Sequence, residues 1–156
     1  MATAVVATRP VTSEDASLLY DTFVTGEAAA WTAMLPHIDN RPVLRRMFAG
    51  QQADYAAQFP GAHHHIIVID GEPAGQVRWA ERDDDVQVVD IGLLPQYRRR
   101  GGAAAIYTRL IEHARRVGKP VRCSVTKMNE PSVALHLGLG FLVESESDTH
   151  YFLVTR

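Results

Sequence analysis

The chain is poor in several features that would point to particular classes of protein. It has one cysteine, Cys123, in 156 residues, so it cannot form an intramolecular disulfide. Its apolar runs are much shorter than the roughly 20 residues that a membrane-spanning helix needs. Its N-terminus lacks the basic and then apolar layout of a secretion signal. These absences exclude a disulfide scaffold and a membrane-spanning protein, and we expect a cytoplasmic protein with no membrane partner.

A strong excess of one charge is also missing. Lysine and arginine number 16 against 18 aspartate and glutamate residues, for a net charge of -2. A nucleic-acid-binding domain is usually basic, so we expect no nucleic acid partner. A chain of 156 residues buries about 70% of its unfolded surface, enough for one core. We therefore expect a single domain over residues 1–156, and the sequence leaves the oligomeric state open, with a homodimer as one option.

Apolar periodicity predicts alternating strands and helices. A capping box at Thr12 and Asp15 marks the first helix start, and Asp70-Gly71 is typical of a hairpin turn. Residues 24–39 have no regular pattern. Strands are expected at 4–7, 63–69, 73–81, 86–94, 121–125, 141–146 and 151–155, and helices at 12–23, 42–58, from 103 to about 118, and 131–139. This alternation favours a mixed α/β fold.

Residues 94–104 are the most informative stretch. An almost continuous apolar strand ends at Pro95, and the residues from Ala103 onward recur at helical spacing. Between them lie three arginines and the small residues Gly101 and Gly102. The free amides and positive dipole end of a helix N-terminus bind anions, and small residues let a phosphate approach the main chain. The sequence therefore predicts a phosphate-binding turn.

Two motifs carry a resemblance to a known family. Arg98-x-x-Gly101-x-Ala103 is similar to the signature with which the GNAT superfamily of acetyltransferases holds the pyrophosphate of acetyl-CoA. Further on, Asn129 followed by residues 135–141 resembles the asparagine and the Leu-Tyr-x-x-Leu-Gly-Phe helix end of that family. The resemblance covers about residues 86–141. It implies a mostly antiparallel central sheet flanked by helices, in the order β-α-α-β-β-β-α-β-α-β.

The resemblance also implies an activity and a co-substrate. The expected reaction moves an acetyl or other acyl group from acetyl-CoA to a primary amine of a small molecule or peptide, by direct attack in a ternary complex. The alternatives are a non-catalytic acyl-CoA-binding or regulatory module and, outside the family, a nucleotide-binding domain. The residues expected to bind the cofactor are Ile91, Leu93, Arg98, Arg99, Arg100, Gly101, Gly102, Ala103, Ala104 and Asn129.

The strand before the turn supplies two catalytic candidates. Gly92 suggests a bulge that would aim the Leu93 amide at the thioester oxygen; the alternative is that it relieves crowding against a helix. A carboxylate at Asp90, within an apolar strand, needs a partner or a shifted pKa, and it could serve as the general base for the amine. Its alternative is a structural aspartate pinned by a neighbour. Asp85 or a water relay are the other options for the base, while Gln87 cannot act as one.

The family usually places a tyrosine where this chain has His136, and that tyrosine reprotonates the departing thiolate. We therefore expect His136 to be the general acid, with a packing or surface histidine as the alternative. Asn129 would anchor the cofactor arm or the turn. Only His63 and His65 of the three adjacent histidines share a strand face, too few for a zinc site, so no metal is expected. The acceptor cleft, or alternatively the core, would include Trp31, Met34, His37, Tyr55 and Phe59.

Overall fold

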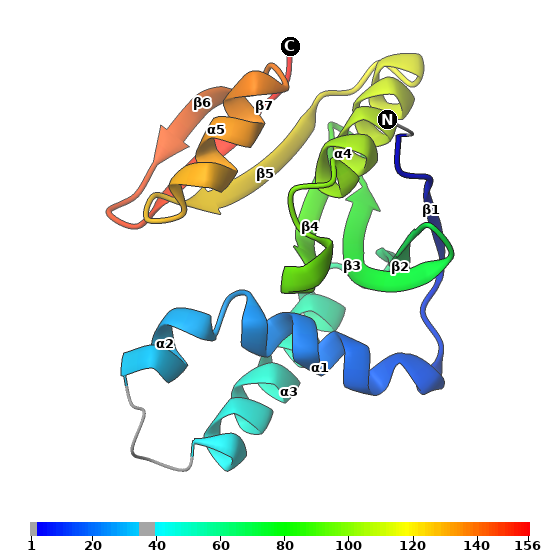
Figure 1. The fold of residues 1–156 in the computed structure, drawn as a ribbon. Helices are drawn as coiled ribbons and strands as arrows, with labels where there is room; N and C mark the ends of the chain where they lie inside the picture. Colours follow the sequence, from blue (N-terminus) through cyan, green and yellow to red (C-terminus); the bar gives the residue numbers. More distant parts are fainter. Residues whose placement is uncertain (1–2, 35–39) are drawn as a thin grey trace. The chain divides into compact units, whose positions relative to one another are not determined.

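The computed structural model describes residues 3–34 and 40–156, with the side chains of residues 30 and 31 left out. It contains a seven-stranded sheet in the order β1-β2-β3-β4-β5-β7-β6 (Figure 1). The strands are β1 Val6–Pro10, β2 His63–Ile69, β3 Glu72–Glu81, β4 Val86–Leu93, β5 Val121–Thr126, β6 Leu142–Glu146 and β7 His150–Val154. The α-helices are α1 Ala16–Thr25, α2 Ala29–Met34, α3 Arg41–Gln58, α4 Gly102–Arg116 and α5 Glu130–Gly138.

The fold class expected from the sequence is confirmed. The sheet is mixed, because β4 and β5 run parallel while β1 with β2, β5 with β7 and β6 with β7 run antiparallel. Most element boundaries agree with expectation within two residues. The irregular segment expected over residues 24–39 is wrong in part, because α2 forms there. That helix has six residues, too few for the apolar spacing of a helix to show in sequence.

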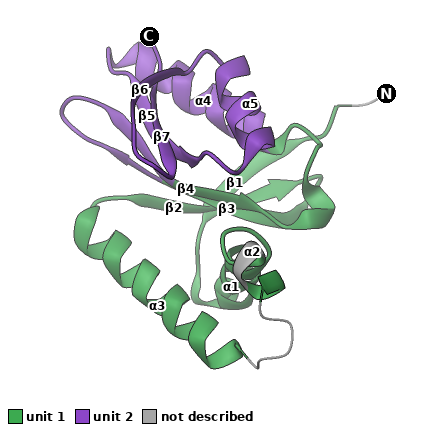
Figure 2. Ribbon diagram, turned by 90° about the vertical axis from the view of Figure 1, so that its left-hand side faces the viewer, with its two compact units in different colours: residues 1–78, 90–102 green, residues 79–89, 103–156 purple. Residues whose placement is uncertain are grey.

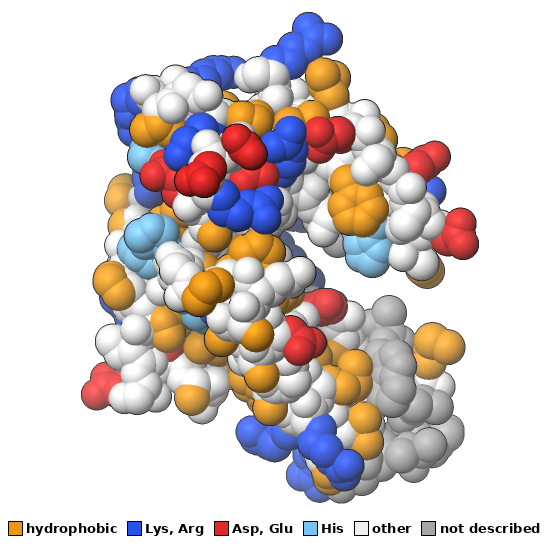
Figure 3. Space-filling model, turned by 180° about the vertical axis from the view of Figure 1, so that it is seen from behind, with side chains coloured by type: hydrophobic (Ala, Val, Ile, Leu, Met, Phe, Trp, Pro, Cys, Tyr) orange, Lys and Arg blue, Asp and Glu red, His pale blue; other side chains and the backbone are white. Residues whose placement is uncertain are grey.

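The chain divides into two compact units, drawn in different colours in Figure 2. Unit 1 comprises residues 1–78 and 90–102, and unit 2 comprises residues 79–89 and 103–156. The expectation of a single domain over the whole chain stays a prediction. In the part of the chain that the structure describes, no helix is long and apolar enough to cross a membrane. Acidic and basic side chains are interspersed on the face shown in Figure 3.

Unit 1 is held together by a strand core and a small helical core. The strand core includes the fully buried Ile66, Ile67 and Val77. Between the helices, Phe23 and Leu44 are buried and Phe48 packs against them. The Asp70-Gly71 turn joins β2 to β3 with positive φ angles of 51° and 82°, so the predicted hairpin is confirmed.

Unit 2 contains the helices α4 and α5 and the strands β5, β6 and β7. The amphipathic α4 buries its apolar face, including Ile106 and Leu110, and α5 contacts β5. Phe141, three residues after the end of α5, and Leu153 of β7 are almost fully buried. The strand β6 lies at the end of the sheet order, and every residue in it is exposed.

The first helical segment begins with the capping box expected from the sequence. It opens with a short 3-10 turn, η1 Ser13–Asp15, whose N-cap is Thr12. The buried Asp15 carboxylate accepts from the Thr12 amide at 2.8 Å and from both terminal nitrogens of Arg9, at 2.8 and 2.9 Å. The hydrogen bonds from Arg9 and Thr12 hold the pKa of Asp15 far below its ordinary value.

We predict that Asp15→Asn lowers the free energy of unfolding at pH 7 by about 1 kcal/mol, since it weakens the cap and the ion pair. Because the pKa of Asp15 is lower in the folded protein, its stabilisation is full above the ordinary value of 3.8 and is lost as pH falls further. The difference in free energy of unfolding between the wild type and the variant should therefore become smaller below about pH 4. Urea titrations from pH 7 to pH 2 measure it, with the exposed Glu14→Gln as control; a constant gap would contradict the prediction.

Candidate functional site

The turn between β4 and α4 has the geometry of an anion site. The chain leaves β4 at Leu93, makes a 3-10 turn, η2 Pro95–Tyr97, and enters α4 at Gly102. Two residues adopt the left-handed region, Arg99 at φ 63° and Gly101 at φ 77°. The first four amides of a helix have no partner within it and form its positive end. The predicted strand, turn and helix start are confirmed; the binding roles of the turn residues stay predictions.

Arg98 has a structural part in this turn. Its Nε donates to the Leu93 carbonyl at 3.0 Å, and its terminal nitrogen donates to the Thr25 carbonyl at 2.9 Å. Thr25 is the last residue of α1, so the side chain ties the turn to the end of that helix. Arg99 and Arg100 are exposed, and the Arg100 guanidinium lies 5.7 Å from the centre of the Tyr97 ring. The three arginines therefore differ in their surroundings, and Arg98 positions the turn.

A chain of side-chain hydrogen bonds crosses β2, β3 and β4 in unit 1 and ends at Asp90. Arg78 donates to Nδ1 of His64 at 3.2 Å, and Nε2 of His64 lies 3.0 Å from Oε1 of Gln76. Gln76 Nε2 donates to Asp90 Oδ2 at 2.9 Å. Since arginine can only donate, His64 must be neutral with its proton on Nε2, and all three bonds run in one direction. The Asp90 carboxylate is the final acceptor.

The surroundings of Asp90 give it the pKa of a base that works near neutrality. Burial raises the pKa to about 6, and the negative charge of Glu27 adds to the rise. The hydrogen bond from Gln76 and the charge of Arg78 act in the opposite direction. A carboxyl group with this pKa is mostly ionised at pH 7 to 8 and can still take up a proton.

The helix α3 contributes further partners to this cluster. Gln52 accepts from Arg78 at 2.6 Å, and the Arg78 guanidinium lies 5.3 Å from the centre of the Tyr55 ring. Burial, together with the charges of Asp90 and Glu27, raises the pKa of Tyr55 far above its ordinary value, so the phenol stays neutral. Sequence reasoning placed Asp90 and Tyr55 but missed the partners His64, Gln76 and Arg78. Their only signal was polar side chains within apolar strands.

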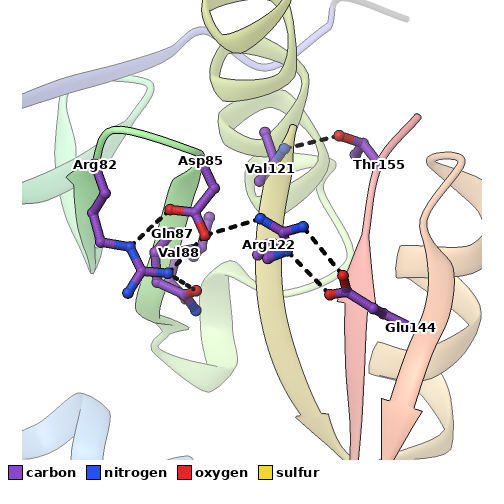
Figure 4. A network of polar contacts seen from close by, with 8 residues as sticks. All are labelled: Arg82, Asp85, Gln87, Val88, Val121, Arg122, Glu144 and Thr155. Atoms are coloured by element: carbon purple, nitrogen blue, oxygen red, sulfur yellow. Dashed lines mark hydrogen bonds and ion pairs between the residues drawn. The ribbon is translucent and has the colours of Figure 1, made fainter. Parts of the chain in front are cut away.

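Asp85, the second candidate for the base, accepts hydrogen bonds from two arginines of unit 2 (Figure 4). It is almost fully buried, accepts from Arg82 at 2.6 and 2.7 Å, and lies 3.3 Å from Arg122. The hydrogen bonds from these arginines lower the pKa of Asp85. Arg122 also binds Glu144, and Gln87 accepts from Arg82 at 3.1 Å. This geometry makes Asp85 the centre of an ion-pair network and leaves Asp90 as the better candidate.

His136, expected as the general acid, has the contacts of a packed histidine. Its exposure is 3%, its Nδ1 donates to the Ser132 carbonyl at 2.6 Å, and its Nε2 accepts from the Tyr107 hydroxyl at 2.8 Å. Burial lowers the pKa of His136, so the ring is neutral. Asn129 caps α5, with its side chain accepting from the Ser132 amide at 3.2 Å. For both residues the structural alternative fits the geometry, and neither enters the proposal below.

The other residues predicted to bind the cofactor lie at the end of β4 and at the start of α4. Ile91 and Leu93 are partly buried at the end of β4, and Ala103 and Ala104 are partly buried in the first turn of α4. A side chain at Gly92 would meet the nearest atom at 3.7 Å, an ordinary contact. The close backbone approach belongs to Gly75 instead, where an added Cβ would lie 2.1 Å from the Gly92 carbonyl oxygen.

The expected acceptor cleft is only partly described. Met34 is exposed, while Tyr55 and Phe59 are partly buried. His37 and the side chain of Trp31 lie outside the described part of the chain. The rings of His63 and His65 lie 6.4 Å apart on the strand face opposite to that of His64.

We predict that His136→Phe lowers the free energy of unfolding by about 1 to 3 kcal/mol, because it removes the buried hydrogen bond between the Tyr107 hydroxyl and Nε2 of His136. Tyr107→Phe is the matched control, and the double variant should be less destabilised than the sum of the two single variants. Urea unfolding of the four proteins measures the coupling. Additive effects, with turnover abolished in a fully stable His136→Phe variant, would favour the general-acid role instead.

Comparison with known proteins identifies the family. Residues 28–141 match the Acetyltransferase (GNAT) family, which is more than half of the chain. No curated protein sequence matches. Among solved structures, the PaiA N-acetyltransferase of Thermoplasma acidophilum in complex with coenzyme A is 12% identical, with a TM-score of 0.67 over 97% of this chain and 99% of that one.

Two other solved structures support the same fold. An acetyltransferase from Thermus thermophilus is 18% identical, with a TM-score of 0.66 over 96% of both chains. The putative acetyltransferase yncA from Salmonella typhimurium, determined with acetyl-CoA, is 20% identical, with a TM-score of 0.58 over 97% of this chain and 93% of that one. These likenesses concern the fold, and the match over residues 28–141 shows that the chain belongs to the Acetyltransferase (GNAT) family.

Proposed function

We propose that this acetyltransferase moves an acetyl group from acetyl-CoA to a primary amine, with Asp90 as the general base. The observation that carries the proposal is the partly buried Asp90, with a pKa of about 6, as the sole carboxylate of β4. Eleven residues later comes the left-handed Gly101 in the turn before α4. Both residues belong to unit 1, which supports a proton acceptor and an anion-binding turn within one compact unit.

The turn residues fit the diphosphate of acetyl-CoA. The space around Gly101 is open, since an added Cβ would meet no described atom within 4 Å. The amides of Gly101 and Gly102 would hold the diphosphate, and the exposed Arg99 and Arg100 would supply positive charge. The main chain of Ile91 and Leu93 would bind the arm that leads to the thioester. When bound, acetyl-CoA supplies an activated acetyl group.

The residues of this chain then have two tasks. A primary amine of the lysine type has a pKa near 10.4 and is protonated at neutral pH, so it cannot attack until a proton is removed. Asp90 takes that proton and passes it to water. The Leu93 amide would donate to the thioester oxygen as negative charge develops there, a contribution of about 3 kcal/mol in other enzymes. The second amine proton leaves with the thiol of CoA, which completes the balance.

Direct transfer, without an acyl-enzyme, is supported by the state of the single cysteine. Cys123 is buried in β5, and burial raises the pKa of its thiol to about 12. The thiolate, which would be the nucleophile, is therefore almost absent at neutral pH. Cys123 is therefore unsuited to carry the acetyl group between two half-reactions.

We predict that Gly101→Asp weakens the binding of CoA at least tenfold. The substitution puts a β-carbon on a left-handed residue and a negative charge where the diphosphate would lie. Isothermal titration calorimetry with CoA measures the effect. Gly61→Asp, in a loop with open space and no positive φ, is the control and should bind as the wild type does. Unchanged affinity in Gly101→Asp would reject this location for the diphosphate.

We predict that kcat/KM of the wild type rises with pH through about 6, because Asp90 must lose its proton before it can act as a base. Asp90→Asn should lose about 100-fold or more in kcat/KM and lack the inflection near pH 6. Asp54→Asn, which removes an exposed carboxylate of α3, should keep both rate and profile. Thiol release recorded from pH 5 to pH 9 measures both profiles, and an inflection near pH 6 that persists in Asp90→Asn would exclude Asp90 as the base.

A further inference from the structure

A small pocket in unit 1 lies between the end of α1 and the middle of α3. It has a volume of about 160 Å³ and is lined by Phe23, Glu27, Ala28, Met47 and Gln51. Phe23 and Ala28 are buried and form part of the helical core. Met47 is 40% exposed, so its thioether side chain forms an accessible apolar wall. The lining is therefore apolar, with one acidic and one amide side chain.

The acidic side chain of the pocket is held by a neutral amide of α3. Gln51 Nε2 donates to Glu27 Oε2 at 2.5 Å. A neutral amide orients the carboxylate but does not neutralise it. Glu27 directly follows the Gly26 cap of α1, and Arg98 holds the neighbouring Thr25 carbonyl at 2.9 Å. The Glu27 carboxylate is thus held from α3, while Arg98 holds the backbone at the end of α1.

The negative charge of Glu27 acts on Asp90. The charge of Glu27 contributes to the raised pKa values of both Asp90 and Tyr55. Such an interaction requires the groups to lie within a short range, because water and salt screen charges that are further apart. An ammonium group that approaches Asp90 is therefore attracted by two negative charges.

We propose that the acceptor is a primary ammonium compound with a compact apolar body, which the pocket binds while Glu27 and Asp90 attract the ammonium. This inference rests on the proposed function and names the substrate class of its site. The volume supports it, since a cavity of about 150 Å³ holds a benzene molecule in another protein. An amine that carries an extra carboxylate would be repelled by the two acidic residues, and a long polycation would leave the apolar wall uncovered.

The test uses the whole protein with acetyl-CoA and five amines: 2-phenylethylamine, 3-methylbutylamine, spermidine, glutamate and ethylamine. We expect thiol release with the first two and a KM at least tenfold higher for the others. Met47→Asn should raise the KM for 2-phenylethylamine about tenfold with little change in kcat, and leave the KM for ethylamine unchanged. Glu27→Gln should raise the KM for all monoamines. The control Val5→Asn, at an exposed site, should behave as the wild type does.

Direct binding separates this inference from the proposed function. Calorimetry with 2-phenylethylamine in the presence of CoA should give binding that Met47→Asn weakens about tenfold. Binding with that sensitivity but no thiol release from any amine would overturn the proposed function and keep the pocket assignment. Efficient turnover of spermidine or glutamate, with no preference for the apolar amines or no effect of Met47→Asn, would overturn the pocket assignment and keep the proposed function.

Discussion

The cluster around Asp90 depends on the placement of a carboxylate within a buried strand. A charged group that loses water must be compensated by hydrogen bonds or opposite charge, or it takes up a proton. Here the neutral amide of Gln76 donates a hydrogen bond to Asp90. Arg78 is linked to Asp90 only indirectly, by hydrogen bonds through His64 and Gln76. The result is partial compensation, so the carboxyl remains ionisable and retains affinity for a proton. A direct ion pair, such as the one that holds Asp85, would have removed that affinity.

The sequence predicted the fold well because its signals were local. The hairpin at Asp70-Gly71 and the capping box at Thr12 each involve a few adjacent residues, and the structure contains both. The strand and helix on either side of residues 94–104 were also clear. The helix α2 was missed, since six residues are too few for a helical period. Local pattern is informative where an element is long or its turn chemistry is specific.

The candidate site was predicted less completely, and the reason is physical. His64, Gln76 and Arg78 meet Asp90 only after three strands pair, and nothing in their spacing along the chain indicates this. His136 shows the opposite case. Its place in the motif suggested chemistry, but the two atoms that would exchange protons are both bonded inside unit 2. The position of a residue in a motif indicates which family the chain resembles. Its burial and its hydrogen-bond partners decide which chemistry it can perform.

The buried thiol of Cys123 has a practical consequence. It is the only cysteine of the chain, it is 4% exposed, and its pKa of about 12 keeps it protonated under ordinary conditions. Maleimides and similar reagents react with accessible thiolates, so the native residue should remain unmodified while the protein is folded. A cysteine introduced at any exposed position would then be the single labelling site. Fluorophores or spin probes could be attached to this protein without first replacing a native residue.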